Sequence, residues 1–301
     1  MTKLFFENVD FSSTSGPNHF ATKLANHFIK NDVAVCPSRE ESDGVLCFIE
    51  SYNPTKPKPM VQRLDGIYFN IIQDYNTLNK NIKRTYDITD GVVFQSEFSR
   101  DLIFHYFGKH DNYEIIHNGA DFQSIESAPL LQNKTLDQYE NVWCCASNWR
   151  PLKRLSENIR YFLEHSGEKD CLVIAGNTED EKINHERIFY VGNLQTKILY
   201  SLYKRSQYFI HLGWVDNCPN VVVDARASGC KIICSSLGGT KEIAGSGATI
   251  IEDIQWDMQP LNVYDPPKMD FTKSTINKHE SILDVNLTAQ KYLQFINKVI
   301  K

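Results

Sequence analysis

The sequence predicts an α/β protein with two parallel-sheet domains, and three observations support that prediction. Short apolar runs alternate with longer helical patterns along most of the chain. The periodicity fades between residues 124 and 140, around SAPLLQNKTLDQYE, and then restarts. The length of 301 residues also fits two domains at roughly 100–200 residues each. We therefore expect Rossmann-like domains at 1–128 and 129–275, followed by a terminal helix at 276–301 that packs back on the first domain.

The first half begins with an apolar run at residues 3–9, a polar turn at 12–18 and a helix at 20–30. Phe20, Leu24 and Phe28 share one side of that helix. The remaining elements expected before the linker are strands at 44–49, 60–64, 91–95 and 113–117 and a helix at 98–107.

The second half repeats the alternation. We expect strands at 141–146, 171–175, 188–191, 208–212 and 231–235, and helices at 154–165, 196–204 and 219–227. At the end of the chain, apolar residues from Ile282 to Ile300 follow helical spacing, which predicts an amphipathic helix that must bury one face.

Composition narrows the classes of partner. The net charge is -5, and neither half has the basic excess typical of nucleic-acid binding. No stretch approaches the roughly 20 apolar residues needed to span a bilayer, and the start has no signal-peptide pattern. The eight cysteines form no C-x-x-C pair, so we expect reduced, structural thiols in a cytoplasmic protein.

A dinucleotide site would require G-x-G-x-x-G directly after a strand. The nearest candidate, Gly245-Ser246-Gly247, lacks the third glycine. A dehydrogenase is therefore disfavoured.

The strongest local signal is HLGWVDNCPNVVVDARASGCKIICSSLGGTKE, from His211 to Glu242. A loop with Asp216 follows a strand, a helix with Asp224 begins near Pro219, and Gly238-Gly239 leads into another helix start. Two helix N-termini near one cleft would suit a diphosphate. Taken singly, each feature has an ordinary alternative: an N-cap acid, an exposed helix residue and a plain tight turn.

This segment resembles the E-x7-E region of family-4 retaining glycosyltransferases, which have the GT-B fold. The chain has Asp216 and Asp224 where that family usually has glutamates. The segments 116–121 (IHNGAD), 146–154 (ASNWRPLKR), 15–17 (SGP) and 62–68 (QRLDGIY) also resemble family segments, so the resemblance covers nearly the whole chain. It implies two Rossmann-like domains, a central cleft and a C-terminal crossover helix.

The resemblance also implies roles for the donor site. Asp224 would bind the ribose of a nucleotide-sugar, Asp216 would orient the donor sugar, and backbone N–H groups around Asn217, Pro219 and Asn220 would hold sugar hydroxyls. Arg150 and Lys153 would neutralise the departing diphosphate, with Arg154 as an alternative cation. The glycines implied in donor binding are Gly16, Gly238 and Gly239.

The sequence indicates fewer candidates for proton transfer and metal binding than for donor binding. Asp65, at the end of an expected strand, is our candidate for a base that accepts the acceptor's proton, and a turn aspartate is the alternative. His19 could touch donor or acceptor, or simply lie at the surface. The family usually works without a metal or cofactor, and we expect the run Glu179-Asp180-Glu181 to be a solvated loop.

We therefore expect a glycosyltransferase that moves a sugar from a nucleotide-sugar to a glycan, lipid-linked or small-molecule hydroxyl acceptor with retention. The alternatives are a GT-B sugar-nucleotide epimerase and a sugar-nucleotide-binding scaffold that no longer catalyses. A lipid-linked acceptor would bring the chain to a membrane, although the acidic first domain gives this little support.

Overall fold

The computed structural model describes residues 2–13, 15–53, 55–178 and 182–300. The chain divides into two compact units, which we treat separately. Unit 1 comprises Met1–Gly119, Asp257–Leu261 and Leu283–Lys301, and unit 2 comprises Ala120–Trp256 and Asn262–Ile282. The chain thus enters unit 2 at Ala120, where the sequence analysis placed the end of the first domain at 128.

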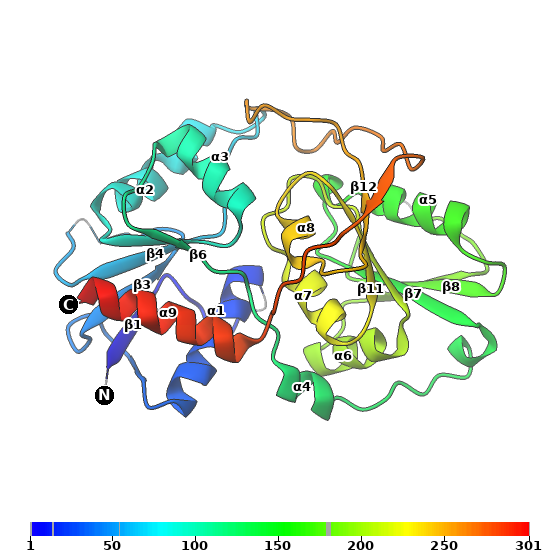
Figure 1. Cartoon of the computed structure of the whole chain (residues 1–301), viewed down its shortest axis with the longest axis horizontal. Coiled ribbons are helices and arrows are strands. Elements are labelled where there is room, and N and C mark those ends of the chain that lie inside the picture. The colour runs from blue at the N-terminus through cyan, green and yellow to red at the C-terminus, as the bar shows by residue number, and fades with distance from the viewer. Residues whose placement is uncertain (1, 14, 54, 179–181, 301) are drawn as a thin grey trace. The chain divides into compact units, whose positions relative to one another are not determined.

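Unit 1 contains a six-stranded parallel sheet in the order β2-β1-β3-β4-β5-β6 (Figure 1). Its strands are β1 (Lys3–Glu7), β2 (Ala34–Cys36), β3 (Gly44–Phe48), β4 (Met60–Leu64), β5 (Gly91–Phe94) and β6 (Tyr113–Ile115). Its helices are α1 (Gly16–Lys30), α2 (Tyr75–Ile88), α3 (Glu97–Phe107) and α9 (Val285–Ile300). The sequence analysis had assigned no range to β2 or α2.

Helices α1 and α9 cover one face of this sheet. Phe20 and Phe28 of α1 and Tyr292 and Phe295 of α9 are buried in one cluster with side chains of β1, β3, β4 and β5. The amphipathic C-terminal helix thus completes the core of unit 1, as its apolar spacing requires. Side-chain caps begin two other helices: Asp74 accepts from Thr77 N at the start of α2, and Ser96 accepts from Ser99 N at the start of α3.

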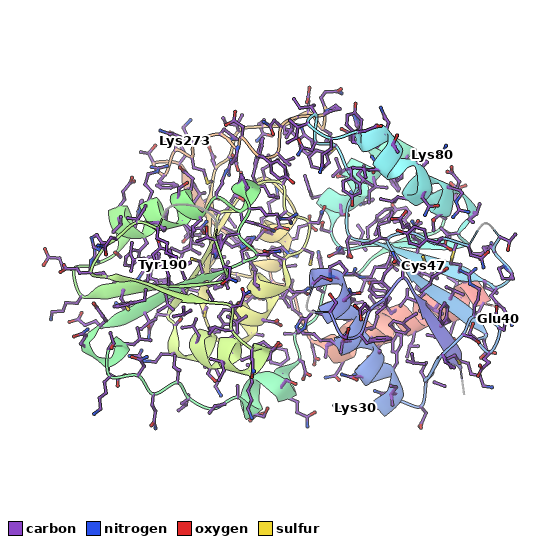
Figure 2. All side chains as sticks on the ribbon, turned by 180° about the vertical axis from the view of Figure 1, so that it is seen from behind. Lys30, Glu40, Cys47, Lys80, Tyr190 and Lys273 are labelled. Atoms are coloured by element: carbon purple, nitrogen blue, oxygen red, sulfur yellow. The ribbon has the colours of Figure 1, made fainter. Side chains whose placement is uncertain are left out.

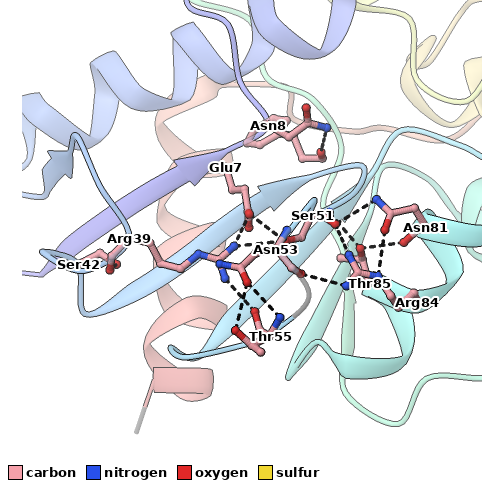
Figure 3. Close-up of polar contacts among 11 residues, drawn as sticks. Glu7, Asn8, Arg39, Ser42, Ser51, Asn53, Thr55, Asn81, Arg84 and Thr85 are labelled. Atoms are coloured by element: carbon pink, nitrogen blue, oxygen red, sulfur yellow. Dashed lines mark hydrogen bonds and ion pairs between the residues drawn. The ribbon is translucent and has the colours of Figure 1, made fainter.

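A buried polar cluster lies beside the ends of β1 and β3 (Figure 3). The Arg39 guanidinium pairs with Glu7 and donates to Ser51 Oγ at 3.2 Å, and Arg84 of α2 donates to the Ser51 and Asn53 carbonyls. These contacts connect the loop after β3 to α2. Figure 2 shows Cys47 of β3 inside unit 1 and Lys80 of α2 at the surface, in agreement with their burial.

Unit 2 contains a seven-stranded sheet in the order β13-β12-β11-β10-β7-β8-β9, parallel except for β13. Its strands are β7 (Asn141–Ala146), β8 (Asp170–Ala175), β9 (Ile188–Gly192), β10 (Tyr208–His211), β11 (Lys231–Ser235), β12 (Thr249–Ile251) and β13 (Ser274–Ile276). Numbered from β7, the parallel strands have the order 3-2-1-4-5-6 of a dinucleotide-binding Rossmann sheet, and the order reverses between β7 and β10.

Helices pack on both faces of this second sheet (Figure 1). The unit contains α4 (Phe122–Ser127), α5 (Leu155–His165), α6 (Thr196–Arg205), α7 (Asn220–Ala227) and α8 (Thr240–Ile243), with short 3-10 turns η1 (Leu136–Gln138) and η2 (Pro151–Lys153). Leu155, Ile159 and Phe162 of α5 are buried against the sheet. Both units are therefore Rossmann-like, as the sequence predicted. Among the described residues, none of the helices is long and apolar enough to cross a bilayer.

Candidate functional site

The sheet order of unit 2 locates the candidate site. In open α/β sheets, ligands bind outside the carboxyl ends of the strands where the strand order reverses. In unit 2 these are the ends of β7 and β10, which are hydrogen-bonded neighbours. Strand β7 ends at Ala146 and β10 ends at His211. The loops that follow them contain Arg150, Lys153 and Asp216, so three predicted site residues come from this edge.

The two loops are joined to each other by hydrogen bonds. Trp214 N donates to the Leu152 carbonyl at 2.8 Å. Asn158, a buried residue of α5, donates to the Arg154 carbonyl at 2.6 Å and to the Lys153 carbonyl at 3.1 Å. Its Oδ1 accepts from Leu212 N at 3.2 Å. One asparagine side chain thus fixes the backbone of both loops.

At the centre of the site, Asp216 accepts two side-chain hydrogen bonds on one oxygen. Its Oδ2 is paired with Lys153 Nζ, and His211 Nε2 lies 2.9 Å from the same atom. The side chains of Lys153 and Asp216 are 13% and 14% exposed, whereas His211 is 3% exposed. The structure therefore brings together Lys153 and Asp216, two of the residues that the sequence analysis named as candidates for the donor site.

The charges of this group follow from its surroundings. Burial alone would raise the pKa of Asp216, but the Lys153 charge and the His211 hydrogen bond outweigh it and hold that pKa well below its usual range. Burial lowers the pKa of His211, and the Asp216 charge offsets only part of that effect. Near neutral pH the carboxylate is ionised and the imidazole is neutral. Because an ionised carboxylate only accepts, His211 must hold its proton on Nε2.

Two glycines in the turn after β11, Gly238 and Gly239, allow that turn to pack closely against the backbone of Asp216. Gly239 N donates to the Asp216 carbonyl at 2.8 Å, and Asp216 and Gly238 form an isolated parallel bridge. Gly238 has φ +113°, and a Cβ there would lie 2.6 Å from the Asp216 carbonyl oxygen. A side chain at Gly213 would crowd His211 Nε2, at 2.9 Å. The predicted Gly238-Gly239 turn therefore positions the Asp216 backbone.

Asp224 lies on α7, the helix that follows the Asp216 loop. It is 5% exposed, and Tyr200 OH is 3.5 Å from its Oδ2. Burial, followed by the charge of Asp224, raises the pKa of Tyr200 far above its ordinary value. Asn217 lies in the preceding loop, Pro219 is the N-cap of α7, and the helix proper begins at Asn220.

The basic residues of the β7 loop differ in their surroundings. Arg154 has a left-handed backbone with φ 51° and forms a two-point ion pair with Asp253, in which both side chains are 1% exposed. Arg150 is exposed, and its guanidinium forms no ion pair with any described residue. Arg154 is thus committed to Asp253, Lys153 is paired with Asp216, and Arg150 is the cation of the loop without an ion-pair partner among the described residues.

Two further polar groups of the site are buried without a hydrogen-bond partner in the part of the chain that the structure describes. These are Trp214 Nε1, in the loop after β10, and Thr240 Oγ1, directly after Gly239. A buried donor without a partner costs free energy, so such atoms are expected where a ligand or a bound water supplies the missing partner.

Three candidate residues from the sequence, Asp65, Gly16 and His19, lie in unit 1. Asp65 follows β4, and its Oδ1 pairs with buried Arg63 and accepts from Gln95 Nε2. Arg63 also donates to Asn118 Oδ1 at 2.9 Å and to Tyr292 OH at 3.1 Å.

Gly16, from the predicted polar turn at residues 12–18, also lies in unit 1. Gly16 is the first residue of α1, directly after the N-cap Ser15, and is exposed. His19 lies in the first turn of the same helix. The acidic run 179–181 lies outside the described residues. Elsewhere in the described ranges, no group of three His, Cys, Asp or Glu side chains could hold a metal ion.

Sequence reasoning assigned no role to His211, Asn158 or Asp253. The motif segment began at His211, and a polar residue at the end of an apolar strand was an available signal. Asn158 and Asp253 gave no comparable signal, because their partners come from loops distant in sequence.

Comparison with known proteins agrees with this architecture. No family model matches the sequence, and no curated protein matches it. Among solved structures, AviGT4, a glycosyltransferase involved in avilamycin A biosynthesis, has a TM-score of 0.63 and 11% identity, with 100% of this chain and 98% of that chain covered. HepE from Anabaena, in complex with UDP and glucose, has a TM-score of 0.63 and 12% identity, with 99% and 100% covered.

A third similar structure is sucrose-phosphate synthase from Thermosynechococcus elongatus. It has a TM-score of 0.64 and 9% identity, with 100% of this chain and 92% of that chain covered. At these identities the similarity concerns the fold, and it extends over the whole chain rather than one domain. The chain therefore has the GT-B fold, the two-domain Rossmann-like architecture of these glycosyltransferases.

Proposed function

We propose that this protein is a glycosyltransferase of the family-4 kind, which transfers a sugar from a nucleoside-diphosphate sugar to a hydroxyl acceptor with retention of anomeric configuration. The observation that supports it best is the contact of Lys153 with Asp216 at the strand-order reversal of a Rossmann sheet. Asp224 on the next helix completes the spacing of the resembled motif. HepE, a structure of the same fold, was solved with UDP-glucose.

Lys153 and Arg150 hold the diphosphate in this proposal. During transfer, the bond from the anomeric carbon to a diphosphate oxygen breaks, and its electron pair goes to that oxygen. Charge-assisted hydrogen bonds from the two cations and from the N–H group of Gly238 stabilise the charge that develops there. These groups would do the work of a divalent cation, so we propose neither a metal nor a cofactor.

Two carboxylates orient the donor in this proposal. Asp224 binds the ribose hydroxyls. Asp216 accepts from hydroxyls of the sugar through Oδ1, because the hydrogen bonds from Lys153 and His211 go to Oδ2. N–H groups of the segment from Asn217 through Pro219 to Asn220 hold further sugar hydroxyls.

The acceptor side belongs to unit 1. The acceptor oxygen bonds to the anomeric carbon and loses its proton, for which Asp65 is our candidate base. Asp65 follows β4 and forms an ion pair with Arg63, which fixes the position of its carboxylate. Gly16, at the start of α1, stays a candidate for contact with the donor.

The experiment is incubation with a panel of radiolabelled UDP-, GDP- and ADP-sugars. We expect release of nucleoside diphosphate with at least one donor, weaker donor binding in Asp224→Asn and lower turnover in Lys153→Ala. Lys231→Ala is the matched control, because Lys231 is exposed and begins β11, at the opposite edge of the sheet. Binding without turnover of any donor would favour the scaffold alternative. If both variants equal the wild type, the site assignment is wrong.

A further inference from the structure

The positive charge of Lys153 is neutralised by its ion pair with Asp216. Lys153 Nζ and His211 Nε2 both donate to Asp216 Oδ2, the second at 2.9 Å. A lysine already paired with a carboxylate offers less positive charge to an incoming anion. Asp216 therefore masks the positive charge of Lys153.

The backbone on both sides of this pair is fixed. The Asp216 carbonyl accepts from Gly239 N at 2.8 Å, and the Lys153 carbonyl accepts from Asn158 at 3.1 Å. A lysine side chain has four rotatable carbons, whereas the aspartate side chain is short. The Lys153 side chain can therefore leave the pair while the backbone of both residues stays in place.

His211 provides the carboxylate with a second donor that does not depend on Lys153. It is the last residue of β10, is 3% exposed and reaches Asp216 from the sheet side of the loop. The missing side chain of Gly213 leaves space for this contact. Because the imidazole is neutral, it holds the carboxylate without cancelling its charge.

We propose that Asp216 exchanges partners when a diphosphate binds: the diphosphate takes Lys153, and His211 alone then positions the Asp216 carboxylate. The proposal rests on the proposed function for the assignment of a diphosphate to Lys153. As a consequence, Asp216 weakens diphosphate binding by holding Lys153, and it is free to orient the sugar only after Lys153 has left. His211 is a positioning residue, whose task is to hold Asp216 after Lys153 has left.

Inorganic pyrophosphate, titrated calorimetrically, is the first probe because it needs neither base nor sugar. Asp216→Asn keeps the side-chain shape and removes the charge, and we expect pyrophosphate to bind about ten-fold more tightly. In the Lys153→Ala background the same substitution should give no gain. Asp137→Asn removes the same charge from an exposed position of unit 2 and should not reproduce the gain. Equal affinities in wild type and Asp216→Asn, an equal gain in both backgrounds, or no pyrophosphate binding at all would overturn the exchange.

The role of His211 has its own test. His211→Phe should weaken pyrophosphate binding, because Asp216 then has no donor other than Lys153. His211→Gln keeps an N–H donor and should restore binding, and in the Asp216→Asn background His211→Phe should have no effect. If His211→Phe does not fold, nitrogen NMR of the wild type still decides: the Nε2–H form of His211 should persist on addition of pyrophosphate. Loss of that form, or equal binding by the Phe and Gln variants, would overturn the role.

These outcomes separate the two proposals. If sugar nucleotides are turned over but Asp216→Asn binds pyrophosphate like the wild type, the exchange is wrong and the glycosyltransferase assignment stands. If no sugar nucleotide binds or reacts but the Lys153-dependent gain is seen, the assignment is wrong and the exchange stands for another diphosphate.

Discussion

The guanidinium of Arg154 and the carboxylate of Asp253 form a two-point ion pair, with N···O distances of 2.6 and 3.1 Å, in which both side chains are 1% exposed. Arg154 directly follows Lys153, and its left-handed backbone begins α5. The pair therefore joins the Lys153 turn to the loop after β12. Arg154, which the sequence analysis named as an alternative phosphate ligand, is therefore already paired with Asp253.

Asp253→Asn should lower the free energy of unfolding of unit 2 by about 3–5 kcal/mol, because it leaves the arginine charge buried without a counter-ion. The four tryptophans at positions 143, 149, 214 and 256 all belong to unit 2, so urea unfolding followed by tryptophan fluorescence reports on this unit. The exposed pair Lys169–Glu140 is the control, and Lys169→Met should leave the midpoint unchanged. Equal midpoints for Asp253→Asn and Lys169→Met would contradict this account.

Asn158→Ala should loosen the site without removing any group proposed to touch the donor. It removes the side-chain partner of the Lys153 carbonyl and of Leu212 N, whereas the Arg154 carbonyl keeps its bond from the backbone N–H of residue 158, at a cost of about 1–3 kcal/mol in the free energy of unfolding. A misplacement of about 1 Å can lower turnover about 100-fold. Donor turnover should therefore fall in this variant and stay at the wild-type rate in Ser156→Ala, an exposed position two residues earlier. Wild-type turnover in Asn158→Ala would show that the clamp is dispensable.

Gly238→Ala and Gly229→Ala form a matched pair. Both glycines have positive φ, +113° and +100°, so an alanine at either position is strained by about 1–3 kcal/mol. A Cβ at Gly238 would also lie 2.6 Å from the Asp216 carbonyl oxygen, whereas nothing lies within 4 Å of one at Gly229. We expect both variants to lose stability, Gly238→Ala more because of this additional clash, and we expect weaker donor binding in Gly238→Ala alone. Equal donor affinities in the two variants would argue against the coupling of this turn to Asp216.

The stability of unit 2 should depend on the protonation of His211. Its pKa is lowered in the folded state, so the unfolded chain takes up the proton first as the pH falls. The neutral imidazole of His211 therefore contributes to the free energy of unfolding above its ordinary pKa of about 6.5. This contribution is lost as the pH falls below that value, by no more than about 1.4 kcal/mol per pH unit. His211→Gln has no such group. Urea unfolding at several pH values between about 8 and 5.5 should show a steeper loss in the wild type than in His211→Gln. Parallel curves would mean that His211 does not titrate as described.

Elements with strong local periodicity could be predicted from the sequence. The strands 60–64, 141–146 and 231–235 have the predicted bounds, because each contains apolar residues and is flanked by turn-forming or polar segments. Helix α2 received no range, since its exposed, polar sequence shows little apolar spacing beyond Ile82 and Tyr86. Strand β2 has only three half-buried residues at the edge of its sheet, too few for a pattern.

The site was predictable only in part, for a similar reason. Lys153, Asp216 and Gly238 lie in loops after strands, and the motif resemblance identified them before their contacts were known. Asn158 and Asp253 act through residues up to 99 positions away, and no local pattern specifies such pairings. Prolines and glycines marked the turns, but the order of the strands determined which turns would meet.

A crystal structure of the protein soaked with UDP tests the central claim most directly. The account predicts diphosphate oxygens within about 3 Å of Lys153 Nζ, ribose hydroxyls on the Asp224 carboxylate and Asp216 still hydrogen-bonded to His211. A nucleotide bound away from the ends of β7 and β10, with Lys153 still paired to Asp216, would contradict it.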